Sequence, residues 1–154
     1  MARALDEARR GEQRDEVPVG AVVVVGGRMV AYAHNETLRT KDPTAHAEIL
    51  ALRRAARRLG LSRLSDAEIY VTLEPCAMCV GAMIQARIAS LTFGCRDPKA
   101  GAVVSLYELT RDRRLNHRFP FREGVLAQEC SRLLSGFFRA RRAETRGARK
   151  APPS

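Results

Sequence analysis

The sequence lacks three features that would place it in particular classes of protein. It has no apolar run near the roughly 18–20 residues that a helix needs to cross a bilayer, so we expect no membrane-spanning segment. Acidic residues, Asp6 and Glu7, stand where a secretory signal would continue with an apolar core, so we expect a cytoplasmic protein. Four cysteines are few for a disulfide framework, and in a reducing compartment they favour metal binding or packing.

The composition is that of one globular domain. Hydrophobic residues make up 45% and charged residues 29% of the 154 residues, and a chain of this length can bury a sizeable core. The formal net charge of +10 favours a nucleic-acid partner, because a large positive charge attracts polyanions. Charge alone does not decide the point, since an arginine-rich surface also promotes solubility.

Helical and strand patterns alternate along the chain. Helices are predicted at residues 3–10, 45–59, 74–87 and from 125 onward, and strands at 17–25, 29–33, 69–73, 89–94 and 118–122. This order predicts an α/β fold, a three-layer α/β/α sandwich with a central mixed sheet that begins with an antiparallel hairpin. We assign residues 1–146 to one domain and expect residues 147–154 to form a basic, disordered tail.

A Cys-x-x-Cys pair, Cys76 and Cys79, follows Pro75 at the predicted start of a helix. Two thiols at this spacing can bind a metal, form a redox dithiol or simply pack, and there is no second such pair to complete a four-thiolate site. His46, at the start of another predicted helix, offers a third ligand. One histidine and two cysteines form a known catalytic zinc set, which leaves the fourth tetrahedral position for water.

Glu48 lies two residues after His46, a spacing that does not place both side chains on one helix face. It is therefore free to handle protons without binding the metal, although a first-turn acid can also serve only the helix dipole. His46-Ala47-Glu48 followed by Pro75-Cys76-Ala77-Met78-Cys79 matches the H-x-E…P-C-x-x-C signature of zinc nucleobase deaminases. The two motifs together favour a catalytic metal site.

With these motifs, most of the chain resembles the cytidine deaminase superfamily and, within it, the bacterial tRNA adenosine deaminases. Further matching blocks are Glu16 to Val22, His34-Asn35, Asp42 to Ile49, Phe93-Gly94, Arg96-Asp97, Leu115 to Arg118, Phe137-Phe138-Arg139 and Arg141-Arg142. The resemblance implies zinc-dependent hydrolytic deamination of adenosine to inosine at the wobble position of a tRNA anticodon. It also implies one Zn²⁺ per subunit, held by His46, Cys76 and Cys79, with Glu48 as the catalytic proton carrier.

The same resemblance indicates residues that contact the RNA. Asn35 matches a residue that hydrogen-bonds the nucleoside, although asparagine after a strand is often a turn former. Asp97 and Lys99 fall in a loop that resembles the RNA-facing loop of the family. Residues 132–150 carry seven basic residues and one acid, which suits phosphate contact or a solvated helix end. The arginines of this stretch that match the family are Arg139, Arg141 and Arg142.

Two other functions and one question of assembly stay open. A deaminase of a free base, guanine or cytosine, would share the zinc signature. A non-catalytic zinc-stabilised RNA-binding module would need a fourth protein ligand. The residues that could supply it, which we expect to pack or hydrogen-bond locally instead, are His34, Cys95, His117 and Cys130. The family forms homodimers, so a homodimer is implied. An apolar helix face that could serve as the contact, or could be core, consists of Val80, Met83 and Ile84.

Overall fold

The computed structural model describes residues 1–150, so the part of the expected tail at 151–154 lies outside the described residues. The helices are α1 (Ala2–Glu12), α2 (Thr37–Thr40), α3 (Ala47–Leu59), α4 (Ala77–Ala86), the short 3₁₀ helix η1 (Leu109–Arg111) and α5 (Ala127–Lys150). The strands are β1 (Gly20–Val25), β2 (Arg28–His34), β3 (Ala67–Leu73), β4 (Ser90–Cys95) and β5 (Phe121–Arg122). None of the helices in this part of the chain combines the length and apolar character needed to cross a membrane.

The five strands form one mixed sheet in the order β2-β1-β3-β4-β5. β1 pairs antiparallel with both β2 and β3, whereas β3, β4 and β5 are parallel to one another. The first strand lies inside the sheet, as its continuous apolar character predicts, and Val23 at its centre is fully buried. The mixed sheet with its leading hairpin is therefore confirmed.

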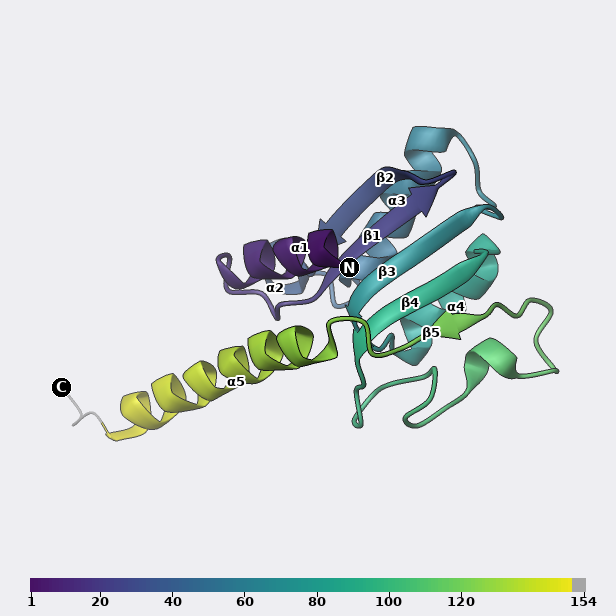
Figure 1. Ribbon diagram of the computed structural model, residues 1–154. Coiled ribbons are helices and arrows are strands. Elements are labelled where there is room, and N and C mark those ends of the chain that lie inside the picture. Colours follow the sequence, from purple (N-terminus) through teal and green to yellow (C-terminus); the bar gives the residue numbers. More distant parts are fainter. Residues whose placement is uncertain (151–154) are drawn as a thin grey trace.

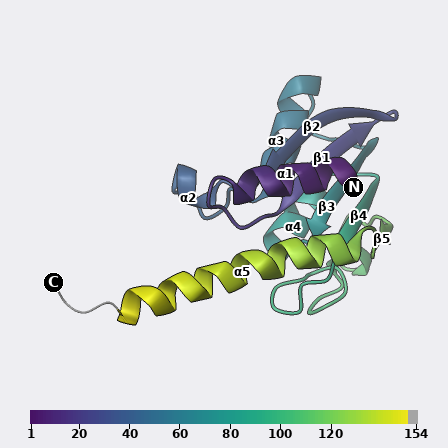
Figure 2. The ribbon, with the colours of Figure 1, turned by 60° about the vertical axis from the view of Figure 1, so that its left-hand side comes forward.

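Helices cover both faces of the sheet. α1 and α5 lie on one face, while α3 and α4 lie on the other (Figures 1 and 2). This arrangement confirms the three-layer α/β/α sandwich. Because β3 and β4 are parallel, both end at the same edge of the sheet, and the chain leaves β3 there to enter α4.

The apolar face of α4 is part of the hydrophobic core. Val80 and Met83 are fully buried and Ile84 nearly so, in one cluster with Ile69 and Phe93 of the sheet. Of the two possible roles for this face, core or dimer contact, the structure shows core. α4 thus covers one face of the parallel strands β3 and β4.

The structure differs from the sequence prediction in three places. Residues 147–150, which the prediction places in the disordered tail, continue α5. Good helix formers there outweigh Gly147, whose cost in a helix is about 1 kcal/mol. The expected edge strand at 118–122 is only β5 (Phe121–Arg122), because Pro120 cannot join a ladder as a donor. The polar segment after β2, where no helix is predicted, contains α2.

Candidate metal centre and substrate cavity

Two helices begin at the candidate metal ligands. His46 is the N-cap of α3 and Cys76 is the N-cap of α4, and both have extended backbone conformations. Cys79 lies one turn into α4. The partial positive charge at a helix N-terminus favours negatively charged groups and lowers the pKa of thiols, so this placement favours a thiolate at Cys76, the N-cap residue.

The three candidate ligands converge on one point. The imidazole Nδ1 of His46 lies 3.7 Å from Cys76 Sγ and 3.5 Å from Cys79 Sγ. All three ligand atoms lie within 4.8 Å of one another. A tetrahedral zinc ion with ordinary bond lengths separates a nitrogen ligand from a sulfur ligand by about 3.6 Å, so the group fits zinc. Within residues 1–150 no fourth histidine, cysteine or carboxylate joins the group, which leaves one position open.

The charges of the two thiols are coupled. A hydrogen bond from Cys79 lowers the pKa of the Cys76 thiol to about 4, and the same contact raises the pKa of Cys79. The hydrogen bond with Cys76 also raises the pKa of His46. Cys76 is therefore the thiol that ionises first. Ionisation of Cys79 beside it is favoured by a cation bound between the two sulfur atoms. A donor set of one imidazole and two thiols is one that zinc prefers.

Glu48 is a buried carboxyl group beside the candidate ligands. It is 4% exposed, and its Oε2 has no hydrogen-bond partner within residues 1–150. Burial raises its pKa to about 7. A buried acceptor without a hydrogen-bond partner lowers the stability of the fold. The position of Oε2 therefore indicates that the substrate or a water molecule supplies a hydrogen-bond donor. A carboxyl group with a pKa near neutrality can both take up and release a proton.

A cavity of about 600 Å³ opens over this group. Its walls come from three parts of the chain: the residues around the candidate metal ligands, the loop after β4, and one face of α5. Its lining residues include Asn35, His46, Glu48, Cys76, Asp97, Pro98, Lys99, Ala100 and Arg142. A more open hollow of about 740 Å³ beside η1 contains none of the candidate ligands.

Three arginines of α5 that match the family, Arg139, Arg141 and Arg142, have different surroundings in the structure. Arg142 lines the cavity, whereas Arg139 is exposed outside it. Arg141 turns to the N-terminal part of the chain, where its Nη2 donates to the Asp15 carbonyl oxygen at 2.7 Å and its guanidinium lies over the Phe137 ring. Of the three, only Arg142 stands where a substrate in the cavity would pass.

Asn35 has a structural contact as well as a place in the cavity wall. Its Oδ1 accepts a hydrogen bond of 2.8 Å from the Ala47 N–H, the first N–H group of α3. Thr44, two residues before the N-cap, does not cap α3, because its N–H and hydroxyl groups donate to Asp42 Oδ1. Asn35 therefore caps α3 from a distance, which keeps Glu48 in place one residue further on.

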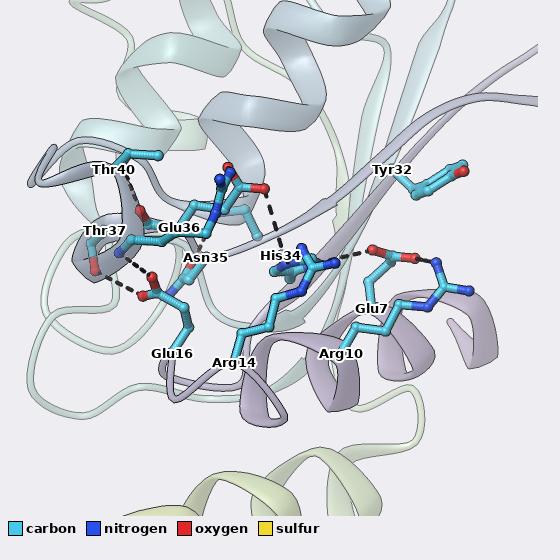
Figure 3. Close-up of polar contacts among 12 residues, drawn as sticks. Glu7, Arg10, Arg14, Glu16, Tyr32, His34, Asn35, Glu36, Thr37 and Thr40 are labelled. Carbon is cyan, nitrogen blue, oxygen red and sulfur yellow. Dashed lines mark hydrogen bonds and ion pairs between the residues drawn. The ribbon is translucent and has the colours of Figure 1, made fainter.

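A buried acid fixes the short helix α2 next to this wall. The Glu16 carboxylate accepts hydrogen bonds from the backbone N–H groups of Leu38 (3.2 Å) and Arg39 (2.8 Å). It also accepts one from the Thr37 hydroxyl, which Figure 3 shows. Thr37 also lines the cavity. Sequence patterns did not indicate α2, because the acid that caps it lies about twenty residues earlier in the chain.

The remaining histidines and cysteines have local partners. His34 Nδ1 lies 3.2 Å from Glu7 Oε2, also visible in Figure 3. His117 Nε2 lies 2.9 Å from the Ile88 carbonyl oxygen, and Cys130 packs against the sheet at 3% exposure. Cys95 lines the cavity, yet it does not join the candidate metal group among the described residues.

Sequence analysis did not identify Glu74, which lies directly before Pro75 and is 1% exposed. Its carboxylate accepts hydrogen bonds from the loop after β4, including the N–H groups of Asp97 and Val104 and the Ser105 hydroxyl. Burial alone would raise the pKa of Glu74, but these hydrogen bonds outweigh it and lower the pKa. An acid directly after an apolar strand is the only sequence signal for it.

The chain is similar in sequence to known deaminases. Residues 1–142 match the family model of the MafB19-like deaminases. The tRNA-specific adenosine deaminase of Bacillus subtilis (strain 168) is 43% identical over 150 residues, which cover 97% of this chain and 93% of that enzyme.

Two solved structures share the fold. A tRNA:A34 deaminase, studied for A-to-I editing at the wobble position of transfer RNA, superposes with a TM-score of 0.83 at 45% identity. The match covers 85% of this chain and 95% of that one. A guanine deaminase from Nitrosomonas europaea superposes with a TM-score of 0.74 at 26% identity, covering 88% of this chain and 81% of that one.

Proposed function

Because this chain belongs to the family of tRNA-specific adenosine deaminases, we propose that it deaminates adenosine to inosine at the wobble position of a tRNA anticodon. The reaction adds water at C6 of the purine and releases ammonia. One observation carries the proposal: the ligand atoms of His46, Cys76 and Cys79 converge within 4.8 Å at the base of a cavity that Glu48, whose buried Oε2 has no hydrogen-bond partner within residues 1–150, also lines.

The metal that we propose is Zn²⁺, one per subunit. His46, Cys76 and Cys79 would hold it, with ligand spacing and donor chemistry that suit zinc. When bound, such an ion supplies Lewis-acid activation of a water molecule.

Glu48 is the residue that we assign to proton transfer. Its carboxyl group takes one proton of the attacking water and delivers it to the purine N1. It then takes the second proton, from the new C6 hydroxyl group, and delivers it to the amine, which leaves as ammonia while C6 becomes a carbonyl. The raised pKa, about 7, suits a group that must change protonation state twice in each cycle. Burial keeps bulk water away from Oε2, so the protons stay with the reacting atoms.

The cavity suits a single base turned out of an RNA loop. Its volume of about 600 Å³ lies within the range of small-ligand pockets. We assign Asn35 to a hydrogen bond with the nucleoside, and Asp97, Lys99 and Arg142 to the rim, where the neighbouring nucleotides pass. Bases of an anticodon loop are already unpaired, so turning one out costs less than it would in a duplex.

Deamination of a free base is the second candidate, since the guanine deaminase of N. europaea shares the fold. Identity is higher with the tRNA-acting enzymes, and Arg142 extends the positive charge of α5 to the cavity. A free base has no phosphate for that charge to bind. The third candidate, a non-catalytic zinc module, needs a fourth protein ligand, and none joins the group within residues 1–150.

Because tRNA is the proposed substrate, we also propose a cytoplasmic location.

The assembly that we propose is a homodimer. Since the apolar face of α4 is core, a dimer contact must use other surfaces. Leu106 and Tyr107, 52% and 56% exposed, are apolar candidates. Light scattering on the purified chain tests the proposal: twice the monomer mass supports it, and the mass of one chain contradicts it.

The experiment that tests the activity compares substrates side by side. Zinc-loaded protein is incubated with a tRNA that carries adenosine at the wobble position and, separately, with free adenine, guanine and cytosine. We expect inosine in the tRNA and no ammonia from the free bases. Activity on a free base alone would contradict the proposal.

A further inference from the structure

We propose that Glu74 is a positioning residue that anchors residues 97–105 to the metal-binding segment and thereby fixes one wall of the substrate cavity. The inference rests on the proposed function, because it concerns how that cavity holds the RNA. Unlike His46, Cys76, Cys79 and Glu48, Glu74 would touch neither the metal nor the reacting atoms.

The hydrogen bonds of the Glu74 carboxylate all lead to the same loop. Oε2 accepts from the Asp97 N–H at 2.9 Å and from the Ser105 hydroxyl. Oε1 accepts from the N–H groups of Val103, Val104 and Ser105 at 3.1, 2.8 and 2.9 Å. One buried side chain thus binds both ends of the loop at once.

Backbone contacts tie the same loop to the residues that follow Glu74. The Ala102 N–H donates to the Pro75 carbonyl oxygen at 2.8 Å, and Gly101 forms an isolated antiparallel bridge with Cys76. The loop therefore lies directly against a candidate metal ligand. Gly101 is required for this approach, since a Cβ atom there would overlap the Glu74 carboxylate.

The tip of the loop faces the cavity. Asp97, Pro98, Lys99 and Ala100 line it, on the wall that adjoins α5. The shape of the tip is set by Asp97, whose Oδ1 accepts from the N–H groups of Lys99 and Ala100 at 3.0 and 3.3 Å. Asp97 thus shapes the tip, and Glu74 fixes where the tip stands relative to the metal ligands.

Two substitutions disturb the hydrogen bonds of Glu74 in different ways. Glu74→Gln keeps the size of the side chain but replaces one acceptor oxygen by an NH₂ group that faces N–H donors. Gly101→Ala keeps Glu74 and displaces its carboxylate. The matched control is Glu7→Gln, because Glu7 is also a buried acid (2% exposed) but pairs with His34 and does not line the cavity.

The measurements are bound zinc, steady-state kinetics on tRNA, and hydrogen exchange of the peptide that contains residues 96–106. For both loop variants we expect zinc content equal to wild type, kcat within about threefold and KM for tRNA raised about tenfold, because the loop is loosened while the reacting groups are not. Loop amides should exchange faster than in wild type. Glu7→Gln should change neither KM nor loop exchange.

Several outcomes would overturn the inference. Loss of zinc in the loop variants would mean that Glu74 supports Cys76, and an unchanged KM despite fast loop exchange would mean that the loop does not hold substrate. If the two variants fail to fold, Ser105→Ala removes only one hydrogen bond; it should raise KM in the same direction, and an unchanged KM contradicts the inference. Wild-type protein inactive on tRNA would refute the proposed function instead, while hydrogen exchange still tests the anchoring.

Discussion

His46 and Cys76 occupy the same position in two different helices: each is the N-cap residue, and His46 Nδ1 lies 3.7 Å from Cys76 Sγ. α3 and α4 lie on one face of the sheet and contact each other, so their N-termini meet. The metal centre is therefore built where two helix N-termini converge. That placement provides both ligands and a local electric field that favours the thiolate form of Cys76.

Replacing one thiol of the pair should remove the metal. In Cys76→Ser the remaining ligands, His46 and Cys79, are too few for a stable zinc site, so bound zinc measured by atomic spectrometry should fall from one per chain to near zero. Cys95→Ser is the matched control, since Cys95 lines the same cavity without joining the ligand group, and it should keep its zinc. Equal zinc content in the two variants would refute the assignment.

Asn35 should affect stability and substrate binding through different atoms. Asn35→Asp keeps the oxygen that caps the Ala47 N–H but loses the amide donor, so stability should hold while KM for tRNA rises about tenfold. Asn35→Ala loses both atoms and should also lower the free energy of unfolding by about 1 kcal/mol. Denaturant unfolding and kinetics on the two variants separate the effects. Equal KM values for Asn35→Asp and wild type would show that the amide does not contact substrate.

Substitutions of the arginines of α5 should have different effects on tRNA binding, according to where each arginine lies. Arg142→Ala should weaken tRNA binding and reduce the slope of log affinity against log salt by about one phosphate contact, because Arg142 lines the cavity. Arg139→Ala, outside the cavity, is the matched control with a smaller effect. Arg141→Ala should mainly lower the melting temperature, since Arg141 binds the Asp15 carbonyl group. Binding titrations at several salt concentrations test the division, and identical slopes for Arg142→Ala and Arg139→Ala would contradict it.

Much of the fold follows from local sequence signals. β-branched runs around Gly26-Gly27 predict the hairpin, and the apolar stripes predict the helices, because these patterns depend on neighbours a few residues away. The two motifs, His46 to Glu48 and Pro75 to Cys79, predict which residues converge, since each motif fixes its own helix start.

What the sequence could not predict depends on distant partners. Glu74 binds amides that lie 23 to 31 residues further along, in a loop with no regular pattern. Asn35 caps a helix that begins twelve residues later, and Arg141 meets Asp15 across 126 residues. Each of these contacts exists only after the layers have packed, so no local pattern encodes it.

Glu36 should make stability depend on pH. It is 6% exposed and accepts hydrogen bonds from Arg39 and Arg54. Burial would raise its pKa, but the two arginines lower it below the ordinary value of 4.5. A lowered pKa in the folded state stabilises the protein above the unfolded-state pKa, and this contribution is lost as the pH falls through the folded-state pKa.

Glu36→Gln should therefore lower the free energy of unfolding by about 1 kcal/mol at neutral pH and by less under acidic conditions. Denaturant titrations across that range provide the measurement. Glu144→Gln, at an exposed position of α5, is the matched control and should show no such pH-dependent difference. A Glu36→Gln effect that stays constant with pH would show that the ionised carboxylate is not the stabilising form.

Inosine formation by Glu48→Gln, measured on zinc-loaded protein with a tRNA that carries adenosine at the wobble position, tests the central claim most directly. The substitution preserves the size of the side chain and leaves His46, Cys76 and Cys79 intact, so bound zinc should match wild type. The amide cannot carry protons, so the rate of inosine formation should fall roughly 10³-fold. Full activity with full zinc content would contradict the account, because the buried carboxyl group beside the metal would then have no part in the chemistry.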